Sequence, residues 1–160
     1  MRIVRIVLLA AALSFPAAAQ NVKSQACDLL TTEEVSEAYR RMSVSVAYGS
    51  GDETMGTTNC SYSSELGGGS ITLTLLKGEA FDGGTADQKF EGMRKSMSDG
   101  RFPFEDLRGV GDKAAMTTLS VANNGYSVLV MKNSAVLSIS VTFLEKSAAL
   151  AVAIIAAGRM

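Results

Sequence analysis

Residues Tyr126 to Phe143 read YSVLVMKNSAVLSISVTF. From Ala135 onward the odd-numbered positions are apolar, and serine or threonine fills most of the even-numbered ones. Such strict alternation predicts a strand with one buried and one solvent-facing side. The run Tyr126–Lys132 is its predicted partner, because Asn133-Ser134 between the two runs suits a two-residue turn with positive φ. We therefore expect a central hairpin in a sheet that has one wet face.

Periodicity and turn residues predict the other elements. Thr31 with Glu34, and Thr85 with Gln88, have the spacing of capping boxes at helix starts. The glycine-containing segment Arg101–Lys113 is expected to be a long connection. Helices are expected over Thr32–Met42, from Thr85 to a stop at Asp99-Gly100, and over Ser147–Arg159. Strands are expected over Ser43–Tyr48, Thr58–Ser63, Ile71–Leu75, Met116–Val121, Tyr126–Lys132 and Ala135–Phe143.

In the first predicted strand, Val44, Val46 and Tyr48 alternate and are expected on one side. Taken together, the order of elements predicts an α+β fold. We expect an antiparallel sheet of about six strands in two meanders, with one face covered by three helices. Residues 20–160 are expected to form a single domain of this kind.

Composition excludes several classes of function. The chain has 160 residues and no histidine, so Ser-His or Cys-His nucleophiles and histidine-ligated zinc are excluded. Without Arg2 and Arg5, which lie in the leader described next, 13 of the 15 basic residues remain against 16 acidic ones. The balance of −3 offers no basic stripe for phosphates, and nucleic acid is therefore not an expected partner.

Residues 1–19, MRIVRIVLLAAALSFPAAA, have the pattern of a secretory signal peptide. Two arginines precede an apolar run, and small residues follow Pro16, so we expect cleavage between Ala19 and Gln20. The alternative, a membrane anchor, is weaker, since the uncharged stretch from Ile6 covers 14 residues and a bilayer needs about 20. The sequence thus predicts a periplasmic or secreted protein with no membrane span after cleavage.

Cys27 and Cys60 are the only two cysteines. In an exported domain a pair is expected to form a structural disulfide, which in the chain-entropy model contributes about 3 to 4 kcal/mol. A redox-active pair and a metal site are the alternatives. The first usually has Cys-x-x-Cys spacing, whereas these cysteines lie 33 positions apart, and two thiolates without histidine make a poor zinc site.

Several short motifs occur in a fixed order: Cys27-Asp28-Leu29-Leu30-Thr31 with Glu34-Val35, then Cys60-Ser61-Tyr62, then Gly109-Val110-Gly111-Asp112-Lys113-Ala114, and an alanine-rich closing helix. This order resembles a family of mostly uncharacterised secreted bacterial proteins and lipoproteins, and more distantly the extracellular sensor domains of some receptor kinases. The resemblance implies a disulfide between Cys27 and Cys60 and an antiparallel sheet with flanking helices. This chain departs from the pattern because it lacks a lipid-anchoring cysteine.

Two surfaces are candidate binding sites. Phe102 and Phe104 flank Pro103, so their rings are expected either to plug an open end of the core, which we favour, or to form a binding lip. The second surface is the polar side of the sheet, where hydroxyls could bind a glycan or a partner strand unless they are ordinary exposed strand residues. Its candidate residues are Thr72, Thr74, Ser138, Ser140 and Thr142, together with Ser43, Ser45, Ser61 and Ser63 on the two preceding predicted strands.

Catalytic signals are weak. Gly109-Val110-Gly111-Asp112 lacks the spacing of a phosphate-binding loop and is expected to be a tight turn in which Asp112 bonds its own backbone. The acidic residues of the glycine-rich loops lack EF-hand spacing. We therefore expect no cofactor, no metal and no catalytic residue.

The sequence as a whole favours an exported, non-catalytic binding domain of the bacterial envelope, monomeric or a weak homodimer. Its expected partner is an envelope protein or a glycan. The alternative is a small hydrolase that uses two carboxylates.

Overall fold

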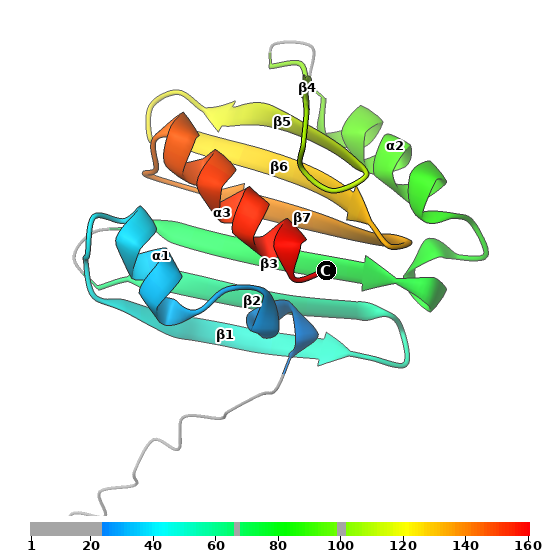
Figure 1. Cartoon of the computed structure of the whole chain (residues 1–160), viewed down its shortest axis with the longest axis horizontal. Helices are drawn as coiled ribbons and strands as arrows, with labels where there is room; N and C mark the ends of the chain where they lie inside the picture. Colours follow the sequence, from blue (N-terminus) through cyan, green and yellow to red (C-terminus); the bar gives the residue numbers. More distant parts are fainter. Residues whose placement is uncertain (1–23, 66–67, 99–101) are drawn as a thin grey trace, which may run out of the picture.

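The computed structural model describes residues 24–65, 68–98 and 102–160 (Figure 1). The predicted leader, its cleavage site at Ala19 and Gln20, and the predicted helix stop at Asp99-Gly100 lie outside these residues. The fold is α+β, with one antiparallel sheet in the order β1-β2-β3-β7-β6-β5-β4. The seven strands are β1 (Val44–Asp52), β2 (Thr57–Ser64), β3 (Ser70–Lys77), β4 (Glu105–Leu107), β5 (Lys113–Ser120), β6 (Gly125–Lys132) and β7 (Ala135–Val141).

Two meanders build this sheet, as the sequence predicts. The first is β1-β2-β3 and the second is β4-β5-β6-β7, and they join where β3 pairs with β7, with Leu73 opposite Ile139. The expected hairpin at residues 126–143 is present, and its turn residues Asn133 and Ser134 have φ values of 50° and 59°. The seventh strand, β4, lies in the segment that was expected to be a connection.

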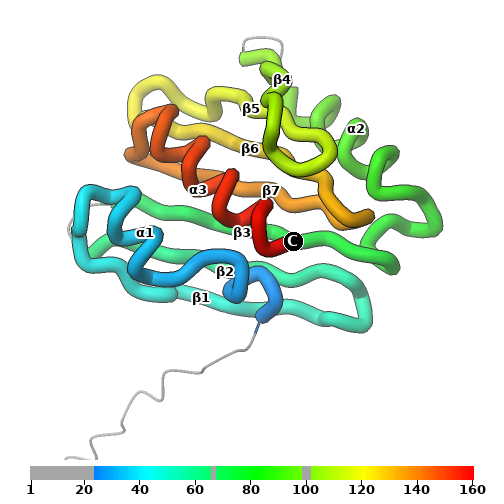
Figure 2. The backbone as a smooth tube through the Cα atoms, viewed as in Figure 1, coloured from blue at the N-terminus to red at the C-terminus, as the bar shows by residue number. Residues whose placement is uncertain are grey.

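Alternation along β7 places Leu137, Ile139 and Val141 in the core, where all three are fully buried. We call this side of the sheet the Ile139 face. Three elements cover it: η1 (Gln25–Leu29), α1 (Thr32–Ala38) and α3 (Lys146–Gly158). Figures 1 and 2 show α1 and α3 lying side by side over the near side of the sheet. The C-terminal Met160 accepts a hydrogen bond from the side chain of Asn133 in the turn between β6 and β7.

The expectation that all three helices cover one face is wrong. Helix α2 (Ala86–Met97), which follows the short η2 (Gly78–Phe81), packs on the opposite side, which we call the Leu129 face. There Phe90 of α2 is buried against Leu129 and Val136, residues that alternate with those of the Ile139 face. Apolar residues on both sides of β6 require cover on both sides, and the run VLVM at 128–131 carries that signal.

Two local predictions, one for α1 and one for β1, are also wrong. Helix α1 ends at Ala38 rather than Met42, because Arg40 and Arg41 adopt left-handed φ values of 57° and 66°. Strand β1 contains a bulge between Val46 and Tyr48, which shifts the register against β2. Since a bulge inserts one residue, Tyr48 points to the Leu129 face whereas Val46 points to the Ile139 face.

The helix starts follow the predicted capping chemistry. Thr31 accepts a hydrogen bond from the backbone of Glu34, and Thr85 accepts one from the backbone of Gln88. Both partners return a bond to the cap residue, which completes two capping boxes. Within the described ranges, no helix is both long and apolar enough to cross a membrane.

Candidate functional site

A disulfide joins Cys27 to Cys60, with the two Cα atoms 5.0 Å apart. It ties η1 to β2, and Cys60 is fully buried. Tyr62, two residues further along β2, donates hydrogen bonds from its hydroxyl to the carbonyls of Leu30 at 2.6 Å and Cys27 at 3.2 Å. Burial, with Glu34 and Asp28 nearby, raises the pKa of Tyr62 to about 12, so the phenol remains a donor. The predicted pairing is confirmed, and the segment before α1 is anchored to the sheet.

Except for Ser43, which precedes β1, the polar residues singled out in the sequence gather on the Leu129 face, over β1, β2, β3 and β7. Strand pairing arranges them in three rows that run across these strands. We call this surface the hydroxyl face. Its rows are Ser45-Ser63-Ser70-Thr142, Tyr48-Ser61-Thr72-Ser140 and Ser50-Asn59-Thr74-Ser138.

Hydrogen bonds within the rows orient these side chains. Thr74 donates to Asn59 at 2.8 Å, and Ser61 and Thr72 share a hydrogen bond of 3.1 Å. Ser70 and Thr142 do the same, also at 3.1 Å. A hydroxyl can donate one bond and accept two, so Ser61, Thr72 and Thr74 keep capacity for a further partner. The Thr142 hydroxyl is already saturated, because it accepts from the backbone of Ser70, shares a bond with the Ser70 hydroxyl and donates to the carbonyl of Gly68. All twelve side chains except that of Ser138 retain solvent exposure.

The hydroxyl face is electrically neutral. None of its twelve side chains carries a charge at neutral pH. At its outer edge Tyr48 is 60% exposed and lies directly opposite Ser61. The surface therefore offers hydrogen-bond donors and acceptors together with one exposed aromatic ring. Sequence reasoning missed Tyr48 as part of this surface, because the bulge that turns it has no clear local signal.

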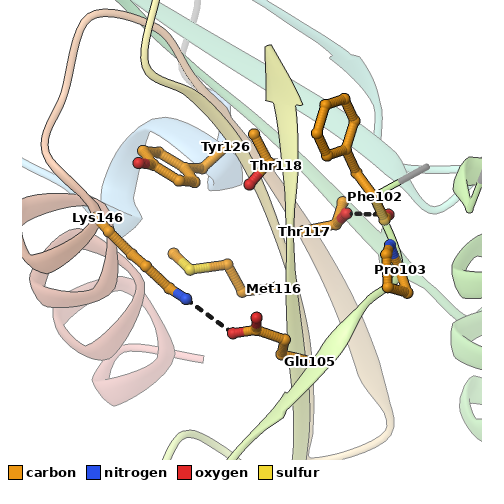
Figure 3. A pocket seen from close by; sticks show the side chains of 8 residues that line it. All are labelled: Phe102, Pro103, Glu105, Met116, Thr117, Thr118, Tyr126 and Lys146. Atoms are coloured by element: carbon orange, nitrogen blue, oxygen red, sulfur yellow. Dashed lines mark hydrogen bonds and ion pairs between the residues drawn. The ribbon is translucent and has the colours of Figure 1, made fainter. Parts of the chain in front are cut away.

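The middle row continues past Ser140 onto β6 and β5 as Ser127 and Thr117. Both are buried: the hydroxyl of Ser127 has no hydrogen-bond partner among the described residues, and that of Thr117 donates to the carbonyl of Phe102. The segment beginning at Phe102 thus closes the inner end of the row. Figure 3 shows Phe102 and Pro103 on the side of β5 opposite Tyr126 and Lys146.

The two phenylalanines of this segment differ. Phe104 is only 8% exposed and packs with Phe90 of α2, as a core plug would. Phe102 is half-buried and lines a small hollow of about 110 Å³ at the β4–β5 edge. On the other side of β5 this hollow is bounded by Glu105, which accepts a 2.7 Å bond from Lys146 (Figure 3).

A larger hollow of about 400 Å³ opens on the Ile139 face beyond the end of α1. Three residues that line it have left-handed φ values without being glycine: Arg40, Asn124 and Phe143. The backbone of Phe143 donates to Asn123, and the buried Tyr39 hydroxyl donates to Thr142, so this conformation is held from two sides. The sequence did not predict this hollow, because none of these three left-handed positions is a glycine.

The loop Gly109-Val110-Gly111-Asp112 is a tight turn, with φ values of 77° and 60° at its glycines. A Cβ on Gly111 would lie 2.6 Å from the carbonyl oxygen of Met131, so the turn packs closely against β6. Asp112 accepts a hydrogen bond from the backbone of Asn133 at 3.1 Å. The expected bond from Asp112 to its own backbone is therefore replaced by one to the central hairpin.

Carboxylates in the described residues lie at the surface, with Glu34 the one that is half-buried. Glu34 is bound by Arg159 at 2.6 Å, and this hydrogen bond, with that from the backbone of Thr31, lowers the pKa of the carboxyl group. No group of three or more His, Cys, Asp or Glu side chains in these ranges could hold a metal ion. Asp87 and Glu91 of α2 lie close together, since both bind the ammonium of Lys113, at 2.6 Å and 3.0 Å, and both side chains are exposed.

No family model, no curated protein and no solved structure matches this chain. The resemblance to small exported domains stays a hypothesis, and the geometry of the hydroxyl face is the basis for assigning a function.

Proposed function

We propose that this chain is an exported, non-catalytic binding domain whose hydroxyl face binds a neutral glycan of the bacterial envelope. The observation that carries the proposal is the three rows of uncharged, hydrogen-bonding side chains on four neighbouring strands. Export is supported by the leader pattern and by the Cys27–Cys60 disulfide, since disulfides persist in oxidising compartments.

The spacing of the rows suits a chain of sugar rings. Neighbouring strands lie about 4.8 Å apart, and successive rows on one strand about 7 Å apart. The first distance is comparable with the length of one pyranose ring, so a glycan lying along the middle row would meet Ser61, Thr72 and Ser140 in turn. At the outer end Tyr48 offers a ring that can pack on the apolar side of a sugar.

A glycan fits this surface better than a protein partner. The buried centre of a protein–protein interface is enriched in aromatic and apolar side chains and depleted in serine. The hydroxyl face has the opposite composition, with Tyr48 its only aromatic residue. Its lack of charge also favours a neutral ligand over an anionic one, and binding should change little with salt.

The test is a titration of the purified domain with neutral oligosaccharides of N-acetylglucosamine, glucose, galactose and mannose. Binding is monitored through the chemical shifts of the backbone amides in NMR spectra. We expect shifts to concentrate on β2, β3 and β7. The double variant Thr72→Val with Ser140→Ala removes two hydroxyls of the middle row and should weaken binding at least tenfold. Thr118→Val is the matched control, because Thr118 is a half-buried threonine on the Ile139 side of β5.

The control should bind like the parent protein, and thermal unfolding should show that both variants remain folded. Binding to none of the four oligosaccharides would overturn the proposal. Equal affinity of the double variant and the control would also overturn it, since the ligand would then bind elsewhere.

A further inference from the structure

The two edge strands of the sheet, β1 and β4, differ in length (Figure 1) and in charge. Strand β4 has three residues, and its Glu105 and Asp106 form ion pairs of 2.7 Å with Lys146 and Arg94. Short, charged edge strands of this kind resist pairing with another sheet. Strand β1 has nine residues and neither of these features, and its protection is limited to the bulge between Val46 and Tyr48, so the two edges are not equally protected.

Strand β1 is an open pairing edge. It reads VSVAYGSGD, without lysine, arginine or proline, and Asp52 at its end is its one charged residue. In the part of the chain that the structure describes, no strand lies on its outer side. Val46 is 48% exposed and Tyr48 60% exposed, one on each side of the strand. An exposed strand of this length can pair with a further strand through its backbone.

Residues of opposite charge lie at the two ends of β1. Arg40 and Arg41 precede it, and Asp52 and Glu53 lie at its end. Arg41 and Glu53 form no ion pair with any described residue. Asp52 accepts hydrogen bonds from Thr54 and Met55, which lower the pKa of its carboxyl group and keep it ionised. Within Arg40 to Glu53 the edge therefore has a basic start and an acidic end. Glu33 and Glu37 of α1 line a hollow together with Arg41, and Lys77 lines one together with Glu53, which reduces this contrast.

An edge with this polarity is complementary to itself. When two copies of one strand pair antiparallel, the start of each lies beside the end of the other. The acidic end at Asp52 and Glu53 would then face the basic start at Arg41 of a second copy. A parallel arrangement would instead place like charges together, which costs free energy.

We propose that two copies of this chain associate through β1, paired antiparallel around a two-fold axis perpendicular to the sheet. Tyr48 of one copy lies opposite Tyr48 of the other, and the two sheets form one continuous antiparallel sheet. Assembly stops at two copies, because the outer edges that remain are the short, charged β4 strands.

The dimer bears on the proposed function. A two-fold axis perpendicular to the sheet keeps both hydroxyl faces on the same side, so their middle rows meet at Tyr48. If the hydroxyl face binds a glycan, as proposed above, one long chain can contact both copies and gain avidity. Association itself does not depend on glycan binding, and the two proposals can fail separately.

The first test is sedimentation of the purified protein over a range of concentrations, without glycan. We expect a reversible monomer–dimer equilibrium. Arg41→Glu and Glu53→Arg should each raise the dissociation constant at least tenfold, and the double charge reversal should restore it to within about threefold of the parent value. Lys95→Glu, on the exposed surface of α2, is the matched control and should have no effect.

The second test is crosslinking of the variant Tyr48→Cys. Both native cysteines are in the disulfide, so the new thiol is the one free thiol among the described residues. Mild oxidation should give a covalent dimer, whereas Val121→Cys, at a comparably exposed position, should give little. A protein that stays monomeric without crosslinking would overturn the proposal. The proposal would also be overturned if neither charge reversal changed the dissociation constant of the dimer and Tyr48→Cys gave no crosslink. Another surface would then mediate association.

Discussion

The Leu129 face of the sheet has two parts with opposite chemistry. Over β6, β7 and the end of β3, apolar side chains lie beneath α2; over β1, β2 and the rest of β3 and β7, hydroxyls are open to solvent. One row crosses the boundary: Thr74 and Ser138 are polar, and the next residue in the row, Leu129 on β6, is fully buried. Neighbouring positions of one sheet thus change from surface to core within a single strand spacing.

This difference shows what each part depends on. The covered part is stabilised by apolar burial under α2, and Lys113 adds ion pairs to Asp87 at 2.6 Å and Glu91 at 3.0 Å. The open part has no helix on its hydroxyl side in the described ranges, so its outer strands depend on the Ile139 face and on the Cys27–Cys60 disulfide. We expect the two parts to respond differently to substitution.

The largest effect is expected from Phe90→Ala in the covered part. Phe90 is fully buried between α2 and the sheet, and removing its ring leaves a cavity. The expected loss is about 4 kcal/mol in the free energy of unfolding. Urea denaturation measures it, with Lys95→Ala on the exposed side of α2 as control. A loss below about 1 kcal/mol would show that α2 contributes little to the fold.

The next effect belongs to the open part. Replacing both Cys27 and Cys60 with serine removes the link between η1 and β2, and the expected loss is about 3 kcal/mol in the free energy of unfolding. Hydrogen exchange should show amides of β1 and β2 losing more protection than those of β6 and β7. Equal loss in all four strands would mean that the sheet unfolds as one unit and that the disulfide does not act locally.

Much of this arrangement could be predicted because its signals are local. Alternation and the turn at Asn133-Ser134 predict the central hairpin, the two capping boxes predict the helix starts, and the cysteine pair predicts the disulfide. The polar positions at Thr72 and Ser140 also follow from alternation. Each signal lies within a few residues or rests on a residue type that occurs only twice.

The rest depends on contacts that periodicity does not encode. The run VLVM at 128–131 indicates that both sides of β6 are covered, but it does not show which helix lies on which side. The bulge before Tyr48 and the short strand at Glu105 have no strong sequence signal. The hydroxyl face as a continuous surface required β3 to pair with β7, which strand spacing alone does not give.

A smaller effect is expected at the boundary between the two parts. Ser127 is fully buried and its hydroxyl has no partner among the described residues, so Ser127→Ala should raise the free energy of unfolding by about 1 kcal/mol. Thr117→Ala, in the same row, removes the bond to Phe102 and should lower it by about 1 kcal/mol. Thermal unfolding of the pair tests this opposite response, and a loss at both positions would mean that Ser127 is satisfied by a buried water.

The smallest change in stability is expected in the middle of the hydroxyl face. Thr72→Val keeps the shape and the strand preference of the side chain and removes its hydroxyl, and water can replace that group at Ser61 because Ser61 is half-exposed. The free energy of unfolding should stay within about 0.5 kcal/mol of the parent value. A loss above 1 kcal/mol in urea denaturation would show that the hydroxyls are needed to hold the strands together. A neutral result would show that the Thr72 hydroxyl is not needed for stability, which leaves this group available for binding a ligand.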